Sequence, residues 1–247
     1  MLRGHFMRNV QINTSWKPRA GDIIVSNWVS WVEILWLAFR FNPVFVLPVS
    51  ESITASSPSA PSAAIAHTPG RRTGTGSAAI SSPSRATSVR TPINGFQTVS
   101  LLTILRATGY VPPYIFTTSG STRTLEEIRR TASGPVVVFP ECTTSNGRGL
   151  LRFAEVFKGY NVPVKGFNVF VIALPPHPIS IRLLNASEGP SSPTFVLSEV
   201  ASGLMPGQDI MSEACATLIA LIGKMKRTGM GWEDKVAFLD FYRGKRK

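Results

Sequence analysis

The stretch GDIIVSNWVSWVEILWL, residues 21–37, is the strongest indication of the fold, because its pattern is that of a buried strand followed directly by a helix. Its first half is rich in β-branched residues and follows Gly21, which is typical of a buried strand. Further on, Ser30 and Glu33 have the spacing of a capping box, in which the hydroxyl accepts a backbone N–H and the Glu side chain reaches back. We therefore expect a helix to begin at Ser30, directly after a strand.

Strands and helices alternate along the rest of the chain. We expect further buried strands at NPVFVLPV (42–49), GPVVVFPE (134–141), VPVKGFNVFVIAL (162–174) and PTFVLS (193–198). We expect helices at 94–110, ending at Gly109, at 124–132, at 150–160, ending at Gly159, and from Met211 to about Gly229. This alternation predicts an α/β fold with a mixed, mainly parallel sheet flanked by helices.

The chain of 247 residues is long enough for one sizeable core, which we place at residues 21–247 after an N-terminal extension, 1–20. Between residues 51 and 91 the composition shifts to Ser, Ala, Pro, Thr and Gly, with no aromatic residue. Such a segment buries too little apolar surface to offset its ordering entropy, so we expect a disordered insertion in the domain. A neutral spacer and a phosphorylation-sensitive tether are the two interpretations of it.

Basic residues dominate the charge: 26 Lys and Arg against 14 Asp and Glu, a net charge of +12. This excess favours an anionic partner, namely nucleic acid, a phospholipid surface or a phosphorylated ligand. The two cysteines, Cys142 and Cys215, form no disulfide framework, which indicates a reducing, cytosol-facing compartment. Charged residues and prolines interrupt the longest apolar stretch, 28–49, so we expect no transmembrane helix. Residues 1–22 lack the apolar run of a signal peptide, so we expect none.

The stretch VVVFPECTTSNGRGLLRF, residues 136–153, carries the strongest functional motif. A buried strand ends at Pro140 and releases a polar loop, and α/β folds place ligand sites beyond the carboxyl ends of strands. Hydroxyls, backbone amides near glycine and an arginine together can hold a phosphate. The loop residues that offer these groups are Glu141, Thr143, Thr144, Ser145 and Arg148.

This segment resembles the Phe-Pro-Glu-Gly-Thr-x-Ser motif of the glycerolipid acyltransferase family, which includes the lysophosphatidic acid acyltransferases. NWVSWVE, residues 27–33, stands where that family carries Asn-His-x-x-x-x-Asp, and residues 162–164 match its Val-Pro-Val motif. The order and spacing of the three motifs, with the tail GMGWEDKVAFLDFYRGK (229–245), resemble the divergent fungal members. The resemblance covers residues 21–247 outside the insertion and implies a glycerol-3-phosphate acyltransferase-like fold.

The resemblance implies an atypical acyltransferase that moves a fatty acyl chain from acyl-CoA to the glycerol hydroxyl of a lysophospholipid such as lysophosphatidic acid. Acyl-CoA is then the co-substrate, with no metal or other cofactor. The protein is expected as a peripheral membrane protein on the cytosolic face of the endoplasmic reticulum or a lipid droplet, with no nucleic-acid partner. A catalytically inactive member that binds lipid or scaffolds at a membrane is the alternative.

The chain departs from the family pattern at the catalytic dyad. Trp28 occupies the position of the proton-accepting His, although indole offers only a donor N–H, and Glu33 replaces the Asp. Cys142 stands where Gly is usual, and Thr144 where Arg is usual. The resemblance therefore implies that the catalytic positions are Glu33 and Trp28. It implies that the substrate-binding residues are Asn27, Glu141, Thr143, Thr144, Ser145, Arg148 and, from a neighbouring loop, Arg123.

Three interpretations of Glu33 stay open. It closes the capping box and does nothing else; it serves as the base, with its pKa raised by an indole-rich setting; or it orients a group from elsewhere, for which His177 is the candidate. Cys142 likewise has two interpretations, a thioester-forming nucleophile or a small residue tolerated in a tight turn. The tryptophans near residue 31 are core or interfacial aromatics, or the wall of an acyl channel.

The last stretch, KMKRTGMGWEDKVAFLDFYRGKRK (224–247), mixes aromatic residues with a basic end. A helix of this composition is typical of a phospholipid interface. A C-terminal helix packed on the domain, with a basic tail, is the alternative.

Overall fold

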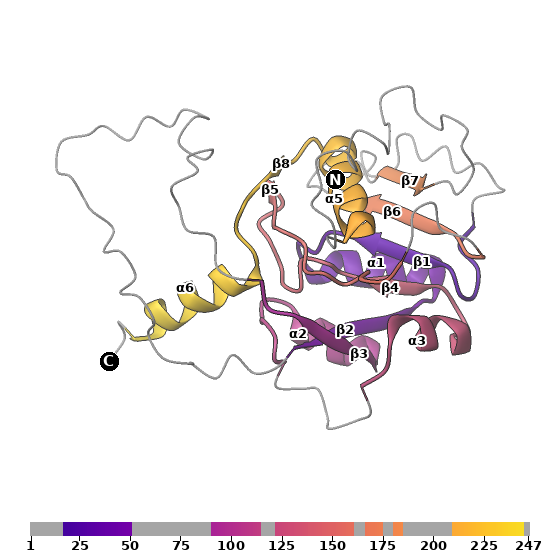
Figure 1. Cartoon of the computed structure of the whole chain (residues 1–247), viewed down its shortest axis with the longest axis horizontal. Coiled ribbons are helices and arrows are strands. Elements are labelled where there is room, and N and C mark those ends of the chain that lie inside the picture. The colour runs from indigo at the N-terminus through magenta and orange to yellow at the C-terminus, as the bar shows by residue number, and fades with distance from the viewer. Residues whose placement is uncertain are drawn as a thin grey trace, which may run out of the picture.

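The computed structural model describes residues 17–50, 90–114, 122–160, 166–174, 180–184 (backbone) and 209–244. In this part of the chain, six strands form one sheet in the order β3-β2-β4-β1-β6-β7 (Figure 1). The four inner strands are parallel, whereas β3 and β7 run antiparallel at the two edges. The bounds are β1 Ile23–Ser26, β2 Val44–Ser50, β3 Ile93–Val99, β4 Val136–Val138, β6 Val169–Ala173 and β7 Ser180–Leu184. The predicted α/β fold with a mixed, mainly parallel sheet is thus confirmed.

Helices cover both faces of the sheet. The helices are α1 Trp31–Phe41, α2 Leu101–Ala107, α3 Leu125–Thr131, α5 Ile210–Gly223 and α6 Trp232–Gly244. Two of them, α1 and α2, pack their buried residues against Phe45, Val137 and Phe170 on one face. On the other face, α3 and α5 pack against the alternate residues of the same strands, such as Val136 and Val138. The inner strands are therefore apolar on both sides, as buried parallel strands must be.

The helix after β1 begins where the sequence predicts. Ser30 is the N-cap: its hydroxyl accepts the Val32 N–H at 3.2 Å, and its own N–H is bonded to the Glu33 carboxylate. At the other end Asn42, with φ 44°, takes the left-handed conformation and closes the helix. The predicted strands at β1, β2, β4 and β6 and the helix at α3, which has its own capping box, are likewise confirmed.

Two predicted helices are wrong in whole or in part. Residues 94–110 were expected to be one helix, but Ile93–Val99 pairs antiparallel with β2 and only Leu101–Ala107 is helical. The predicted helix at 150–160 is instead a short strand, β5 Gly149–Leu150, followed by turns. In the first segment, pairing with the distant strand β2 replaces the local helical preference. In the second, only the start is paired, where β5 meets β8, Lys226–Arg227.

The end of α5 is also earlier than predicted. The helix stops at Gly223, and Lys224 caps it with a φ of 50°, so it does not reach Gly229. Strand β8 follows almost at once, and its pairing with β5 draws the chain away from the helix axis.

Several expectations fall outside the described residues: the 1–16 extension, most of the insertion (51–89), the Val-Pro-Val motif and the strand at 193–198. The last two residues of the expected insertion are described, and both are bonded. Arg90 pairs with Glu155 at 3.3 Å, and the Thr91 N–H donates to Glu233 at 3.0 Å.

Candidate functional site

The two motif loops meet at the carboxyl ends of β1 and β4. The Trp28 N–H donates to Oε1 of Glu141 at 3.1 Å, and the Ser145 N–H donates to the Trp28 carbonyl at 2.8 Å. Since β1 and β4 are parallel neighbours, their carboxyl ends share one edge of the sheet. Segments more than 100 residues apart in the sequence are thereby joined at this edge of the sheet.

The first loop supplies the buried side of this junction. The Asn27 side chain donates to the Leu174 carbonyl at 3.0 Å and accepts the Leu174 N–H at 2.8 Å, which ties the end of β1 to the end of β6. The Trp28 ring is fully buried and stacks on Phe139 with ring centroids 5.0 Å apart. Among the described residues, its indole N–H has no hydrogen-bond partner. Both side chains therefore build the core beneath the loops and do not face solvent.

Glu141 links the two loops through hydrogen bonds. Its side chain is fully buried, and besides the Trp28 N–H it accepts the Leu151 N–H at 3.1 Å. Burial raises the pKa of this carboxyl to about 8, although the backbone donors and the nearby Lys235 ammonium favour the charged form. Glu141 therefore holds the loop in shape rather than meeting a ligand directly.

Cys142 adopts a left-handed conformation, with φ 54°, at the position where the family motif carries Gly. Its carbonyl accepts the Tyr114 hydroxyl at 2.5 Å, and its thiol is buried. Burial raises the pKa of the thiol well above its usual value, which disfavours the thiolate that a nucleophile needs. The geometry supports the interpretation of a small residue in a tight turn.

Lys235 of α6 supplies a cation to the same loop. Its ammonium donates to Oγ1 of Thr143 at 2.9 Å and to the carbonyl of Thr144 at 2.8 Å. Partial burial lowers the pKa of Lys235, and the charge of Glu141 opposes this shift. Lys235 thus places its positive charge beside the motif position where the family has Arg and this chain has Thr144. No local sequence signal marks it, because the contact joins segments 91 and 92 residues apart.

Glu33 and Arg148 are the predicted charged residues near the junction that are not fully buried. Glu33 is half-buried at the first turn of α1, and burial raises its pKa while its bonds to Ser30 oppose the shift. Arg148 is exposed; its backbone N–H donates to Asn146 at 3.0 Å, and no described residue accepts from its guanidinium. A half-buried carboxylate and a free guanidinium are groups with which a ligand can interact.

Arg123 is not brought to this site. Its backbone pairs with Phe96 on the outer edge of β3, at 2.8 and 3.0 Å, and its guanidinium donates to Thr131 at 3.0 Å. Three strand spacings, roughly 14 Å, separate that position from β4. The predicted contribution of Arg123 from a neighbouring loop therefore has no support in the arrangement of the sheet.

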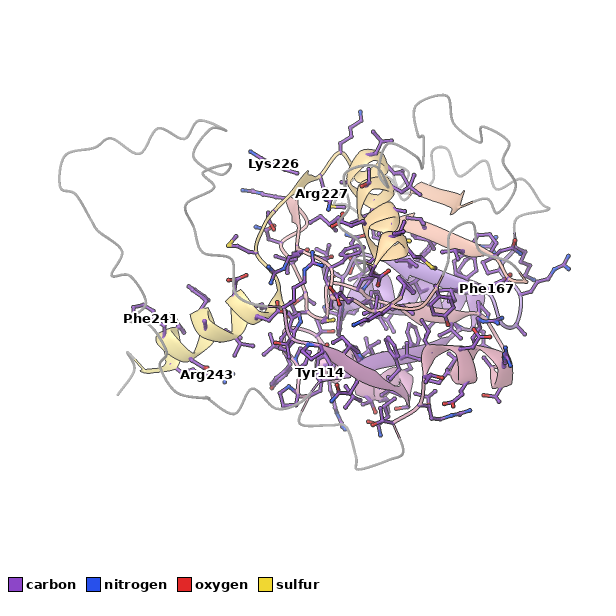
Figure 2. All side chains as sticks on the ribbon, in the orientation of Figure 1. Tyr114, Phe167, Lys226, Arg227, Phe241 and Arg243 are labelled. Atoms are coloured by element: carbon purple, nitrogen blue, oxygen red, sulfur yellow. The ribbon has the colours of Figure 1, made fainter. Side chains whose placement is uncertain are left out.

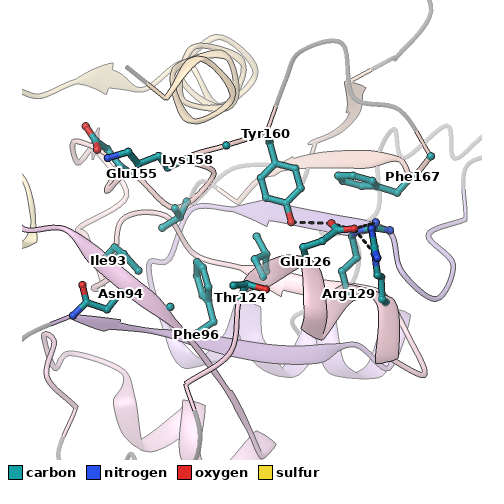
Figure 3. A pocket seen from close by; sticks show the side chains of 16 residues that line it. Ile93, Asn94, Phe96, Thr124, Glu126, Arg129, Glu155, Lys158, Tyr160 and Phe167 are labelled. Atoms are coloured by element: carbon teal, nitrogen blue, oxygen red, sulfur yellow. Dashed lines mark hydrogen bonds and ion pairs between the residues drawn. The ribbon is translucent and has the colours of Figure 1, made fainter. Parts of the chain in front are cut away.

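A groove of about 960 Å³ lies on the α3 side of the sheet (Figure 3). In it, Glu126 accepts hydrogen bonds from Arg129 at 2.6 Å and from the Tyr160 hydroxyl at 3.2 Å, and Arg129 lies over the Phe167 ring at 4.1 Å. The pairing with Arg129 and Arg130 lowers the pKa of Glu126 to about 2. Since none of the predicted site residues lines this groove, it is separate from the junction of the motif loops.

None of the helices in the described ranges combines the length and apolarity needed to cross a bilayer. Comparisons with protein-family models, curated proteins and solved structures found no match to this chain.

Proposed function

We propose that the protein is an atypical acyl-CoA-dependent acyltransferase with a glycerol-3-phosphate acyltransferase-like fold. It moves a fatty acyl chain to the glycerol hydroxyl of a lysophospholipid such as lysophosphatidic acid, at a cytosol-facing membrane surface of the endoplasmic reticulum or a lipid droplet. One observation carries the proposal: residues 27–33 and 141–148, the segments that resemble the two catalytic motifs, are hydrogen-bonded to each other at one sheet edge.

In this mechanism Glu33 is the general base, because the Trp28 indole accepts no proton and is buried. The carboxylate takes the proton of the glycerol hydroxyl, and the oxygen attacks the thioester carbonyl of acyl-CoA. The C–S bond then breaks, and the CoA thiolate leaves with the proton that Glu33 returns. A pKa raised by burial makes the Glu33 carboxylate a better proton acceptor than an exposed one.

Arg148 binds the anionic headgroup in this scheme, since its guanidinium is exposed and has no acceptor among the described residues. Guanidinium binds phosphate through paired hydrogen bonds. The Lys235 ammonium adds positive charge to the same loop from α6 and stands in for the Arg that Thr144 replaces.

Glu33→Gln tests the role of the base. Gln at this position still completes a capping box, so the helix start is kept while the proton acceptor is lost. With labelled oleoyl-CoA and lysophosphatidic acid, we expect turnover to fall by about 10²–10⁴-fold at an unchanged melting temperature. Glu127→Gln is the matched control, because Glu127 holds the same place in the capping box of α3 and its turnover should equal that of the wild type. Turnover of Glu33→Gln within twofold of the wild type would remove Glu33 from the mechanism.

Arg148→Ala tests the headgroup contact. We expect the KM for lysophosphatidic acid to rise by about tenfold with little change in the KM for acyl-CoA, because the variant loses a charge-assisted contact to the phosphate. Arg123→Ala is the comparison variant, and its KM for the acceptor should stay within twofold of the wild type. Equal effects of the two variants, or a larger effect at Arg123, would contradict this assignment of the headgroup site.

A non-catalytic, lipid-binding member is the second candidate, and the burial of Trp28 at the family's His position favours it. The same assay separates the two: a folded protein that retains lysophosphatidic acid but forms no product under any condition would belong to this second class.

A further inference from the structure

The outer surface of α1 is apolar. Trp31, Leu35 and Phe39 recur at every fourth residue and so lie along one stripe of the helix. All three are exposed, Trp31 at 56% and Phe39 at 93%. Val32, also exposed, widens the stripe. A helix that buries Ile34 and Leu37 against the sheet therefore carries a second apolar face toward solvent.

The neighbouring helix extends this surface. Helices α1 and α2 are in contact and pack on the same face of the sheet. Leu102 of α2 points outward and is 67% exposed. We call the five exposed side chains together the α1–α2 face: Trp31, Val32, Leu35, Phe39 and Leu102. Exposed apolar residues that gather in this way mark an interaction surface, unlike those scattered singly.

The charge on these helices is positive. Arg40 and Arg106 are exposed in the last turns of α1 and α2. Glu33 is the one acidic residue in the two helices, and its carboxylate is engaged by the N-cap at Ser30. An apolar surface that contains Trp and Phe and is flanked by Arg complements a phospholipid surface, where aromatic rings lie at the headgroup level and arginines contact anionic lipids.

We propose that the α1–α2 face docks on the surface of an anionic phospholipid membrane. The inference rests on the proposed function, since it brings the membrane that holds the acyl acceptor to the helix that carries Glu33. The junction of the motif loops lies at the start of this helix, three residues before Trp31. An acceptor whose acyl chain stays in the membrane can thus present its glycerol end at the edge of the sheet.

This surface differs from the C-terminal tail that the sequence indicates. The first turn of α6 is held to the body by Trp232, Glu233 and Lys235, and the helix then projects away from the sheet (Figure 1). Figure 2 shows Phe241 and Arg243 near its far end, remote from the crowded side chains of the sheet. The α1–α2 face, in contrast, lies on two helices that pack against the sheet that carries the site.

Vesicle flotation of the full chain tests the docking. Phe39→Glu/Leu102→Glu puts two charges into the face, and both positions are exposed enough that the fold should be kept. With vesicles of phosphatidylcholine and phosphatidylserine, we expect the affinity of this variant to fall roughly tenfold or more. Leu221→Glu is the matched control, because Leu221 is a 51% exposed leucine of α5, on the other side of the sheet, and its binding should equal that of the wild type.

A second pair of variants tests the charge. Arg40→Gln/Arg106→Gln should weaken binding to anionic vesicles severalfold, whereas Arg130→Gln/Lys158→Gln removes two exposed charges elsewhere and should not. Equal losses for the two pairs would mean that net charge, and not this face, directs the binding, and would overturn the proposal. Sedimentation of the protein without vesicles tests whether a second copy of the chain occupies the face instead of a membrane. A wild-type dimer that Phe39→Glu/Leu102→Glu converts to a monomer would assign the face to a second copy and also overturn it.

Turnover on a short-chain, water-soluble acceptor separates this inference from the proposed enzyme activity. We expect Phe39→Glu/Leu102→Glu to keep that turnover while it loses flotation. Wild-type flotation that depends on the face in a protein with no turnover would leave the docking intact and end the enzyme proposal. If the protein turned over its substrate but the face variants did not change flotation, the enzyme proposal would stand and the docking proposal would be wrong.

Discussion

Glu141 is a carboxyl enclosed by the protein and held by two backbone donors. Because its pKa in the fold, about 8, lies above the ordinary value of 4.5, the folded state takes up a proton more readily than the unfolded chain. The stabilisation from this group is therefore fully present below pH 4.5 and is lost as the pH rises towards 8.

Glu141→Gln removes this titration. We expect the free energy of unfolding of the wild type, relative to the variant, to decline between pH 5 and pH 8 by up to about 1.4 kcal/mol per pH unit. Urea unfolding at three pH values measures the decline, and the exposed Glu127→Gln serves as the control with a constant difference from the wild type. If the free energy of unfolding of the wild type relative to Glu141→Gln stayed constant or rose with pH, Glu141 would be charged in the folded state.

Single residues were predictable where their partners are local. Ser30 and Glu33 lie within one turn, so their capping box follows from spacing alone. The tryptophans of the same stretch were not: Trp28 is core and Trp31 is exposed, although both lie in a similar apolar run. Which ring is covered depends on Phe139 and on the helices that pack from elsewhere, and no local pattern contains that information.

At the scale of elements, the first turn of α6 is bound to the motif loop through Lys235. Lys235→Met keeps most of the side-chain stem and removes the hydrogen bonds to Thr143 and Thr144. We expect the protein to lose about 1–3 kcal/mol of stability, because these loop oxygens lose a charged donor. Hydrogen exchange should become faster in α6 and in residues 143–145 before it does in β1 or β4.

The matched control for this prediction is Lys158→Met, at an exposed lysine outside the loop. Exchange in α6 should be the same in this control as in the wild type. If Lys235→Met left the exchange of α6 unchanged as well, the helix would be held by its other contacts, among them the buried Trp232 and the Arg152–Glu233 pair.

Elements that carry their own start and stop signals were predicted well, and those stabilised by distant partners were not. Helix α3 has a capping box at Thr124 and Glu127, and β4 is a run of three valines. Strand β3, in contrast, lies mostly in a segment that the sequence predicts to be helical, because its assignment as a strand depends on six residue pairs with β2. The insertion before β3 separates the two strands along the sequence, so a short window of sequence contains only one of them.

At the scale of the whole molecule, the order of the strands creates the candidate site. Strand β1 lies between β4 and β6, so the end of the first predicted strand meets the loop after residue 140 and also Leu174. The same order leaves Arg123 at the far edge, beyond β3. The topology therefore brings the predicted site residues of the two motif loops together at the junction. It leaves Arg123 away from them.

Local sequence patterns were enough to predict the α/β class, the strand-to-helix turn at Ser30 and the polar loop after β4, and composition gives the basic charge. These properties follow from periodicity, capping and composition, which act within a few residues. The three-dimensional structure was needed to show that Trp28 and Glu141 are buried while Trp31, Phe39 and Arg148 are exposed, and that Lys235 contacts the motif loop. Burial and long-range hydrogen bonds depend on which segments the sheet brings together, and that choice is made by the packing of the whole chain.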